Sequence, residues 1–287
     1  LLGVSNANEV NIFSARHYDS DVQLYQKFSE KTGVKVNVVS GKDKALQKRI
    51  IEEGKECVAD LYITADAGRL GSFQEKGMFQ RTSSKVLKKA IPSNFRSPYW
   101  FGIAKRARVI YYNPSRTNPP NNLSYEDLAD SKYKGKVVIR KSSNVYNQSL
   151  VASLIANNGK KKTAEWAKGM VDNMARKPKG NDRAQILAVA AGEAEFAVAN
   201  TYYIALMLSG KKGPEQQAAA KKVKPFFPNQ DDRGTHMNIS GGGVLKYAPN
   251  KSNAIKLLEF LLTKEAQQHI VNNTFEYPMI DGVYPNK

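Results

Sequence analysis

The chain has 287 residues, a hydrophobic fraction of 41% and a formal net charge of +18 at pH 7. This length accommodates two modest domains or one large one. The mean hydropathy is −0.51, and no run approaches the roughly 20 apolar residues of a membrane span. A single cysteine, Cys57, excludes an intrachain disulfide and a thiolate metal cluster. We interpret it as an inert core thiol in a buried strand.

The positive charge recurs along the whole chain, with short clusters at 160–162, 211–212 and 221–222. A balance this basic is typical of proteins that meet phosphates, nucleic acid or an anionic membrane. No arginine-rich arm, zinc-finger spacing or aromatic RNA-binding stripe accompanies the lysines. We therefore interpret them as a solvated surface and expect no nucleic-acid partner.

The first eight residues, Leu1 to Asn8, look like the small-residue end of a trimmed signal peptide. This pattern predicts an exported protein. A cloning remnant or an ordinary frayed terminus would give the same pattern.

The first hundred residues alternate between strand and helix patterns. In chain order we expect a strand at 10–13, a polar loop at 14–21, a helix from 22 to Gly33, a strand at 34–38, a helix around 46–51, a strand at 58–63 and a helix within 64–77. This order predicts an α/β fold with a parallel sheet covered by helices on both faces.

Prolines punctuate the segment that follows, and a strand at 103–112 is expected to make the first crossing between two lobes. We then expect a strand at 137–140, a polar loop at 141–147, helices around 150–155, 166–170 and 184–191, a strand at 194–199, a return crossing at 226–229 and a helix at 253–262. The predicted first lobe is 1–100 plus about 228–280. The second is about 101–227 plus the C-terminal tail.

Tyrosine recurs at the edge of the sheet where ligands are expected. Open α/β sheets bind ligands in the crevice at the carboxyl ends of their strands. Three predicted loops lie there, and they carry Tyr18, Tyr146 and the pair Tyr202–Tyr203. With 14 tyrosines in the chain, packing is the usual role of this residue, and we assign Tyr111–Tyr112 to core and sheet surface.

These tyrosines suit a hard trivalent cation. Fe(III) prefers anionic oxygen donors, and an ion at bonding distance deprotonates a phenol whose usual pKa is about 10. Four phenolates with Fe(III) carry one net negative charge, which a cation such as Arg106 would offset. His17 adds a neutral donor, although a loop histidine is usually just solvated.

Several segments resemble the periplasmic ferric-ion-binding proteins of ABC transporters, and the similarity covers nearly the whole chain. They are Glu9–Tyr18, Asp60–Gly68, Arg106–Asn113, Ser142–Tyr146, Ala199–Tyr203 and Gly241–Gly243. The match is best with the tyrosine-rich subgroup, which is taken to bind iron without carbonate or phosphate.

The resemblance implies a type II periplasmic-binding-protein fold: two lobes joined by two hinge strands around a central cleft. It implies Fe(III) ligands at Tyr18 in one lobe and at Tyr146, Tyr202 and Tyr203 in the other. It leaves His17 open as a fifth ligand. It places Arg106 beside the metal, with Arg108 as the alternative counter-charge. An ABC permease is the implied partner, the periplasm the location, and a monomer the expected state.

Three other classes of function remain alternatives. No dinucleotide-binding, P-loop or nucleophile-elbow motif is present, and none of the three histidines has metalloprotease spacing, so we do not expect an enzyme. A binding protein of the same fold for an anion or a small organic solute would suit the basic charge but not the tyrosine loops. A nucleic-acid binder would require a steep salt dependence of DNA retention. The charge also leaves anionic ferric chelates or an acidic membrane surface as candidate partners.

Overall fold

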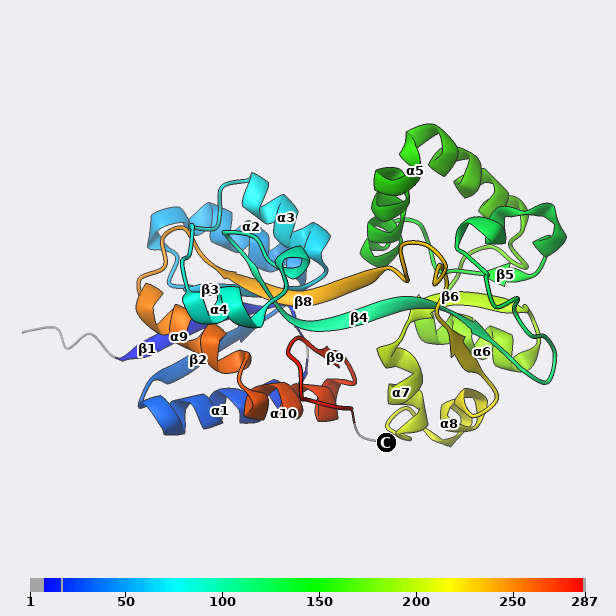
Figure 1. The fold of residues 1–287 in the computed structure, drawn as a ribbon. Helices are drawn as coiled ribbons and strands as arrows, with labels where there is room; N and C mark the ends of the chain where they lie inside the picture. Colours follow the sequence, from blue (N-terminus) through cyan, green and yellow to red (C-terminus); the bar gives the residue numbers. More distant parts are fainter. Residues whose placement is uncertain (1–7, 17, 286–287) are drawn as a thin grey trace, which may run out of the picture. The chain divides into compact units, whose positions relative to one another are not determined.

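The computed structural model describes residues 8–16 and 18–285. It divides into two compact units, which are described separately (Figure 1). Unit 1 comprises Leu1–Lys105 and Ile239–Lys287, and unit 2 comprises Arg106–Asn238. The predicted signal-peptide remnant at residues 1–7 and the candidate ligand His17 lie outside the described residues.

Unit 1 is built on a mixed sheet. Strand β1 lies between β2 and β3 and runs parallel to both, and β8 runs antiparallel to β3. The parallel part confirms the strand–helix alternation expected for the first hundred residues, whereas the antiparallel β8 corrects the all-parallel prediction. The strands that lie wholly in this unit are β1 (Glu9–Ser14), β2 (Lys35–Ser40), β3 (Leu61–Ala65) and β9 (Tyr277–Pro278). Two further strands, β4 (Phe101–Tyr112) and β8 (Met237–Val244), contribute to both units.

Strand β8 carries three consecutive glycines because neighbouring backbone approaches them closely. A Cβ at Gly241 would lie 2.6 Å from the carbonyl oxygen of Phe101, and one at Gly243 would lie 2.5 Å from that of Tyr99. Glycine in a strand commonly marks such an approach. The segment therefore forms a buried strand despite its low strand propensity.

Helices cover the unit 1 sheet, and α1 packs beside α10 (Figure 1). Helix α1 buries Leu24, Tyr25 and Phe28 and ends at Gly33, whose φ of 71° gives the left-handed cap that glycine adopts most easily. The helices are α1 (Ser20–Thr32), α2 (Asp43–Glu53), α3 (Ala67–Glu75), α4 (Lys85–Ala90), α9 (Lys251–Leu261) and α10 (Lys264–Thr274), with short 3-10 turns at Gly54–Glu56 and Ser93–Phe95.

Unit 2 has its own sheet, in which β6 pairs antiparallel with β4 and parallel with β5, while β7 pairs antiparallel with β4. Its longest helix, α5, is kinked at Gly159, where φ is 81°, so the two helices predicted there form one interrupted element. The remaining elements are β5 (Val137–Val138), β6 (Phe196–Asn200), β7 (Lys224–Phe226), α5 (Val145–Asp172), α6 (Asp182–Ala191), α7 (Tyr202–Leu208), α8 (Pro214–Ala220) and 3-10 turns at Glu126–Ala129 and Ser131–Tyr133.

The division between units differs from the predicted lobes in two places. The chain returns to unit 1 at Ile239, inside β8, and not at 226–229. That earlier segment begins with β7, which pairs with β4 in unit 2. The C-terminal tail belongs to unit 1 because β9 pairs with Ala104 and Lys105 and because the Met279 amide donates to Gln267 of α10.

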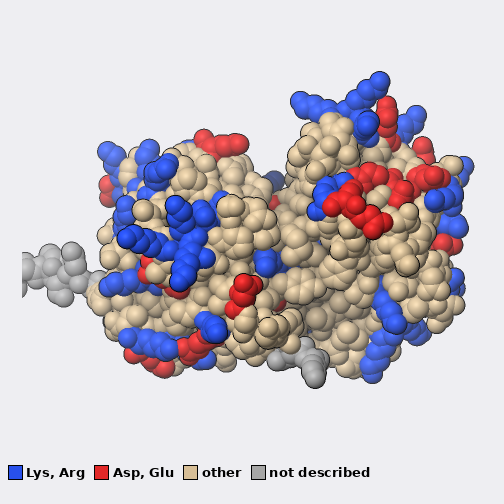
Figure 2. Space-filling model, in the orientation of Figure 1, with Lys and Arg blue, Asp and Glu red and all other residues tan. Residues whose placement is uncertain are grey.

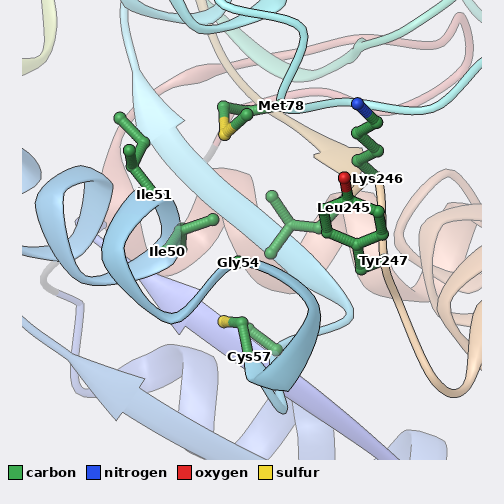
Figure 3. A pocket seen from close by; sticks show the side chains of 9 residues that line it. Ile50, Ile51, Gly54, Cys57, Met78, Leu245, Lys246 and Tyr247 are labelled. Atoms are coloured by element: carbon green, nitrogen blue, oxygen red, sulfur yellow. The ribbon is translucent and has the colours of Figure 1, made fainter.

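Cys57 lies in unit 1 beside a small apolar cavity of about 190 Å³, lined also by Ile50, Met78, Leu245 and Tyr247 (Figure 3). The thiol is buried, as predicted, and burial raises its pKa. The strand expected around it begins later, at Leu61. Among the described residues, no helix is both long and apolar enough to cross a bilayer.

Candidate functional site

Three of the four predicted ligands lie together in unit 2. The Tyr202 hydroxyl donates to the Tyr146 hydroxyl at 3.2 Å, and the rings of Tyr202 and Tyr203 lie 4.3 Å apart between centroids. Tyr202 and Tyr203 open α7, directly after β6, and Tyr146 is the second residue of α5. The residues predicted for loops therefore begin helices, but at the expected edge of the sheet.

The position of Tyr146 is fixed by the residues on either side of it. The side chain of Asn144 caps α5 by accepting from the Tyr146 amide at 3.0 Å. The buried Asn147 donates to the Arg140 carbonyl at 2.8 Å and accepts from the Arg108 guanidinium at 2.5 Å. The start of the helix is thus tied to both the preceding loop and strand β4.

Two guanidinium groups lie against the Tyr146 ring. The Arg106 Cζ is 5.3 Å from the ring centroid and the Arg140 Cζ is 5.5 Å from it. Both distances fall within the range of a cation–π contact. Arg106 is only 2% exposed, so its positive charge is held close to the phenols with little screening by water.

Arg108, the alternative to Arg106, makes different contacts. Its guanidinium donates to Asp182 at 3.0 Å, to Asn200 at 2.9 Å and to Asn147. Of the two arginines on β4, Arg106 therefore contacts a predicted ligand, whereas Arg108 holds together the elements that carry the ligands.

Asp182 is a fully buried carboxylate at the first turn of α6. Asn181 caps this helix by accepting from the Ala184 amide, which fixes where the helix begins. The Asp182 carboxylate accepts from Arg108, from the Asn200 amide at 2.8 Å and from Arg140 at 3.4 Å. It therefore positions Arg140, which in turn lies against Tyr146.

The Tyr203 phenol is protonated at neutral pH without a bound cation, because its pKa is raised. Burial, the neighbouring Tyr146 and the charge of Asp182 raise the pKa of Tyr203 to about 12, although Tyr202 and Arg140 act in the opposite direction. Only a ligand that strongly favours the phenolate form can replace this proton near pH 7.

Tyr18, the fourth predicted ligand, belongs to unit 1. The Arg16 Cζ lies 4.5 Å from its ring centroid. Arg16 is paired with Asp21 at 2.8 Å and with Glu276 at 2.5 Å, and all three side chains are buried. Burial would lower the pKa of Arg16, but the two carboxylates outweigh it and raise that pKa well above its usual value.

Sequence reasoning missed Arg140 and Asp182. Arg140 follows β5 at the start of the loop that leads to Tyr146, so the rule that ligands bind at the carboxyl ends of strands would have included it. Asp182 lies far from the tyrosines in sequence and gives no local signal. Within the described part of the chain, no three His, Cys, Asp or Glu side chains form a metal-binding group. Tyrosine is thus the donor type that the structure gathers.

Known proteins with related sequences and structures cover nearly all of this chain. Residues 56–287 match the family described as bacterial extracellular solute-binding protein. Iron uptake protein A1 of Synechocystis is 50% identical over 97% of this chain and 78% of its own length. The Fe(3+)-binding periplasmic protein of Serratia marcescens is 28% identical over 96% and 80%.

Solved structures agree with these relatives. A Trichodesmium protein in complex with iron and citrate is 53% identical, with a TM-score of 0.94 over 97% of this chain and 89% of its own. The ferric binding protein from Campylobacter jejuni is 43% identical, with a TM-score of 0.89 over 97% and 89%. This likeness confirms the predicted α/β fold of two-lobed periplasmic binding proteins. The chain therefore belongs to the bacterial extracellular solute-binding proteins.

Proposed function

We propose that this chain is an extracytoplasmic carrier that binds Fe(III) through tyrosine phenolates and delivers it to the permease of an ABC transporter. The observation that carries the proposal is the cluster of Tyr146, Tyr202 and Tyr203 beside the guanidinium groups of Arg106 and Arg140. Relatives named as iron uptake and ferric-binding proteins support it.

The charge around the cluster fits anionic ligands. Arg108 and Arg140 share the buried carboxylate of Asp182, so these three side chains carry a net charge of +1. Arg106 brings a further guanidinium group against the Tyr146 ring. Three phenolates would not be tolerated in an apolar pocket, because buried charges require compensation. Here the arginines and the trivalent ion together supply that compensation. Arg106 and Arg140 act as counter-charges and Asp182 as a positioning residue.

Ferric iron is the cargo in this proposal, and a binding role without catalysis accounts for the site. Fe(III) is a hard ion that favours anionic oxygen donors. It would displace the proton that burial retains on the Tyr203 phenol of the free protein. Coordination by Tyr18 of unit 1, with His17 as a further donor, stays a prediction, as do the monomeric state, the periplasmic location and the ABC permease as partner.

The test replaces Tyr202 and Tyr203 together by phenylalanine and measures ferric binding by the visible charge-transfer band and by chelator competition. We expect the band to disappear and the affinity to fall by more than the about 10- to 100-fold typical of a lost outer-shell partner. Tyr112→Phe, a half-buried tyrosine on β4 in the same unit, is the matched control and should leave both unchanged. An unaltered spectrum in the double variant would overturn the proposal.

The alternative, a carrier for an anion or a small organic solute, predicts a different outcome. The arginines would still attract an anion, but the phenol hydroxyls would act as neutral hydrogen-bond donors. Such a protein would remain colourless with ferric iron, and calorimetry would show heat of binding with the anion alone.

A further inference from the structure

One stretch of the chain carries ten lysines and arginines and no acidic residue. Residues 76–125 contain no aspartate or glutamate. The part of this stretch that belongs to unit 1, residues 76–105, carries seven lysines and arginines. Helix α4 lies in the middle of that part and contributes Lys85, Lys88 and Lys89. The proposed iron site uses none of these three lysines.

Helix α4 is anchored so that its lysines face outward. Leu87 is fully buried, and its amide donates to the side chain of Ser84, which caps the helix. The Ser84 hydroxyl in turn donates to Glu259 of α9 at 2.6 Å. Lys85, Lys88 and Lys89 are exposed, and Figure 2 shows basic side chains gathered over α4.

These lysines are not neutralised by nearby acids. Across the described parts of the chain, ion pairs involve lysines such as Lys31, with Glu265, and Lys48, with Glu52, but none involves the three lysines of α4. The carboxylate that approaches α4 is Glu259, and it accepts from the helix cap. Val86, between the lysines, is 51% exposed, so the outer face of α4 combines an apolar side chain with three ammonium groups.

The chemistry of this face favours an anionic lipid surface over a discrete site. Lysine ammonium groups are strongly hydrated point charges and do not make the bidentate contacts that arginine offers to individual phosphates. Clustered lysines are attracted to membranes that contain anionic lipids, and an exposed apolar side chain can enter the headgroup region. Single-stranded nucleic acid would require aromatic side chains for base stacking, and α4 has none.

We propose that the outer face of α4, formed by Lys85, Val86, Lys88 and Lys89, binds the surface of membranes rich in anionic lipid. The association is electrostatic and reversible, because a single basic face without a lipid anchor does not hold a protein permanently. It would keep the carrier near the bilayer that holds its transporter. This inference does not depend on the identity of the cargo.

The experiment is co-sedimentation of the full chain with vesicles of phosphatidylcholine alone or mixed equally with phosphatidylglycerol. Binding should require phosphatidylglycerol and should be lost at about 1 M salt, where the screening length is about 3 Å. The test variant is Lys85→Gln with Lys88→Gln and Lys89→Gln. Since each lysine near an anionic surface contributes about fivefold, the three changes should weaken vesicle binding about 100-fold.

The matched control replaces Lys160, Lys161 and Lys162 of α5 by glutamine, which removes the same charge from unit 2. This control should bind vesicles nearly as well as the parent, and both variants should keep the parent's melting temperature and ferric affinity. Equal losses in the two variants would mean that net charge alone drives binding, and would overturn the assignment to α4. Retention on polyaspartate beads but not on phosphatidylglycerol vesicles would identify an acidic protein as the partner and overturn the membrane proposal.

Discussion

An arginine lies against a tyrosine ring in each unit, but the two arginines are neutralised differently. In unit 1, Arg16 contacts Tyr18 and is paired with two buried carboxylates, Asp21 and Glu276. In unit 2, Arg106 and Arg140 contact Tyr146, and the carboxylate Asp182 is shared between Arg140 and Arg108. The group in unit 1 is net negative and the group in unit 2 is net positive.

The difference suits two separate roles for the same kind of contact: folding in unit 1 and, under the proposed function, ligand binding in unit 2. In unit 1 the charge of Arg16 is already balanced, so it links the start of α1 to Glu276 near the C-terminus of the chain. In unit 2 Arg108 and Arg140 share one carboxylate, Asp182, and guanidinium groups beside Tyr146 favour the deprotonated form of a phenol. We expect loss of an arginine to reduce stability in unit 1 and ligand affinity in unit 2.

The largest effect is expected for Arg16→Gln. It leaves Asp21 and Glu276 buried without their partner, and breaking a buried ion pair in this way costs about 3–5 kcal/mol. Urea unfolding should show this loss. Lys48→Gln is the control, because its pair with Glu52 is exposed and such pairs contribute about 0–1 kcal/mol. Equal stability of the Arg16 variant and the parent would contradict the structural role of Arg16.

Arg140→Gln should lower ferric affinity and leave stability nearly unchanged. Asp182 keeps its hydrogen bonds to Arg108 and Asn200, so the midpoint of urea unfolding should change little. Ferric affinity should fall about 10- to 100-fold, as for other outer-shell partners of metal ligands. The charge-transfer band should also shift, which a purely structural defect would not cause.

Arg183→Gln is the matched control for Arg140, since Arg183 lies in the same unit and donates to Gln216 of α8. Its affinity and spectrum should equal those of the parent. A normal spectrum and affinity in the Arg140 variant would assign the counter-charge to Arg106 alone.

The pH dependence of ferric binding tests whether phenol protons are lost on binding, without altering any residue. Because the pKa of Tyr203 is raised to about 12, this phenol is protonated at neutral pH and would have to lose its proton in order to coordinate iron as proposed. Affinity should therefore rise with pH, by about tenfold per pH unit for each proton displaced. Competition with a chelator of known protonation behaviour between pH 6 and 8 measures the slope. A flat profile would show that no phenol is displaced from its proton.

The smallest effect is expected for Glu126→Gln, far from the arginine–tyrosine contacts. Burial alone would raise the pKa of Glu126, but hydrogen bonds from Asn229, Asn158 and Arg233 lower it below the usual 4.5. Stability from this ionised group is present above pH 4.5 and is lost as the pH falls through the lowered value. The variant should lose under about 1 kcal/mol at pH 7, because the side chain is partly exposed.

The difference between the Glu126 variant and the parent should vanish in acid, as measured by urea unfolding at several pH values. Glu165→Gln, an exposed carboxylate on α5, is the control and should show no difference at any pH. If Glu126→Gln still differed from the parent in its free energy of unfolding at low pH, the effect of the substitution would come from packing and not from charge.

Much of unit 1 could be predicted from local patterns. A helix that stops at Gly33 was expected, because amphipathic spacing and a terminal glycine are local signals. Strand β8 was not expected, because three glycines weaken a strand signal. The glycines are required because backbone carbonyl groups of residues distant in sequence approach them closely. A local sequence pattern contains no information about such an approach.

The site shows the same limit. The tyrosines could be selected because each follows a strand, and three of them do lie together in unit 2. Asp182 could not, because its partners Arg108, Arg140 and Asn200 are brought to it only by the tertiary fold. The role of Asp21 in the first turn of α1 could not be predicted either, because its partner Arg16 is buried beside it only in the folded unit.

The discontinuity of unit 1 affects how the protein is made. Strand β3 lies next to β8, where Leu61 pairs with Val244, yet all of unit 2 is synthesised between them. At about 5–20 residues per second, the ribosome needs on the order of ten seconds to cover that interval. The second unit in the sequence is thus complete first, while the apolar edge of β3 waits unpaired. We expect that edge to be open to chaperones or a translocation channel until β8 has been synthesised.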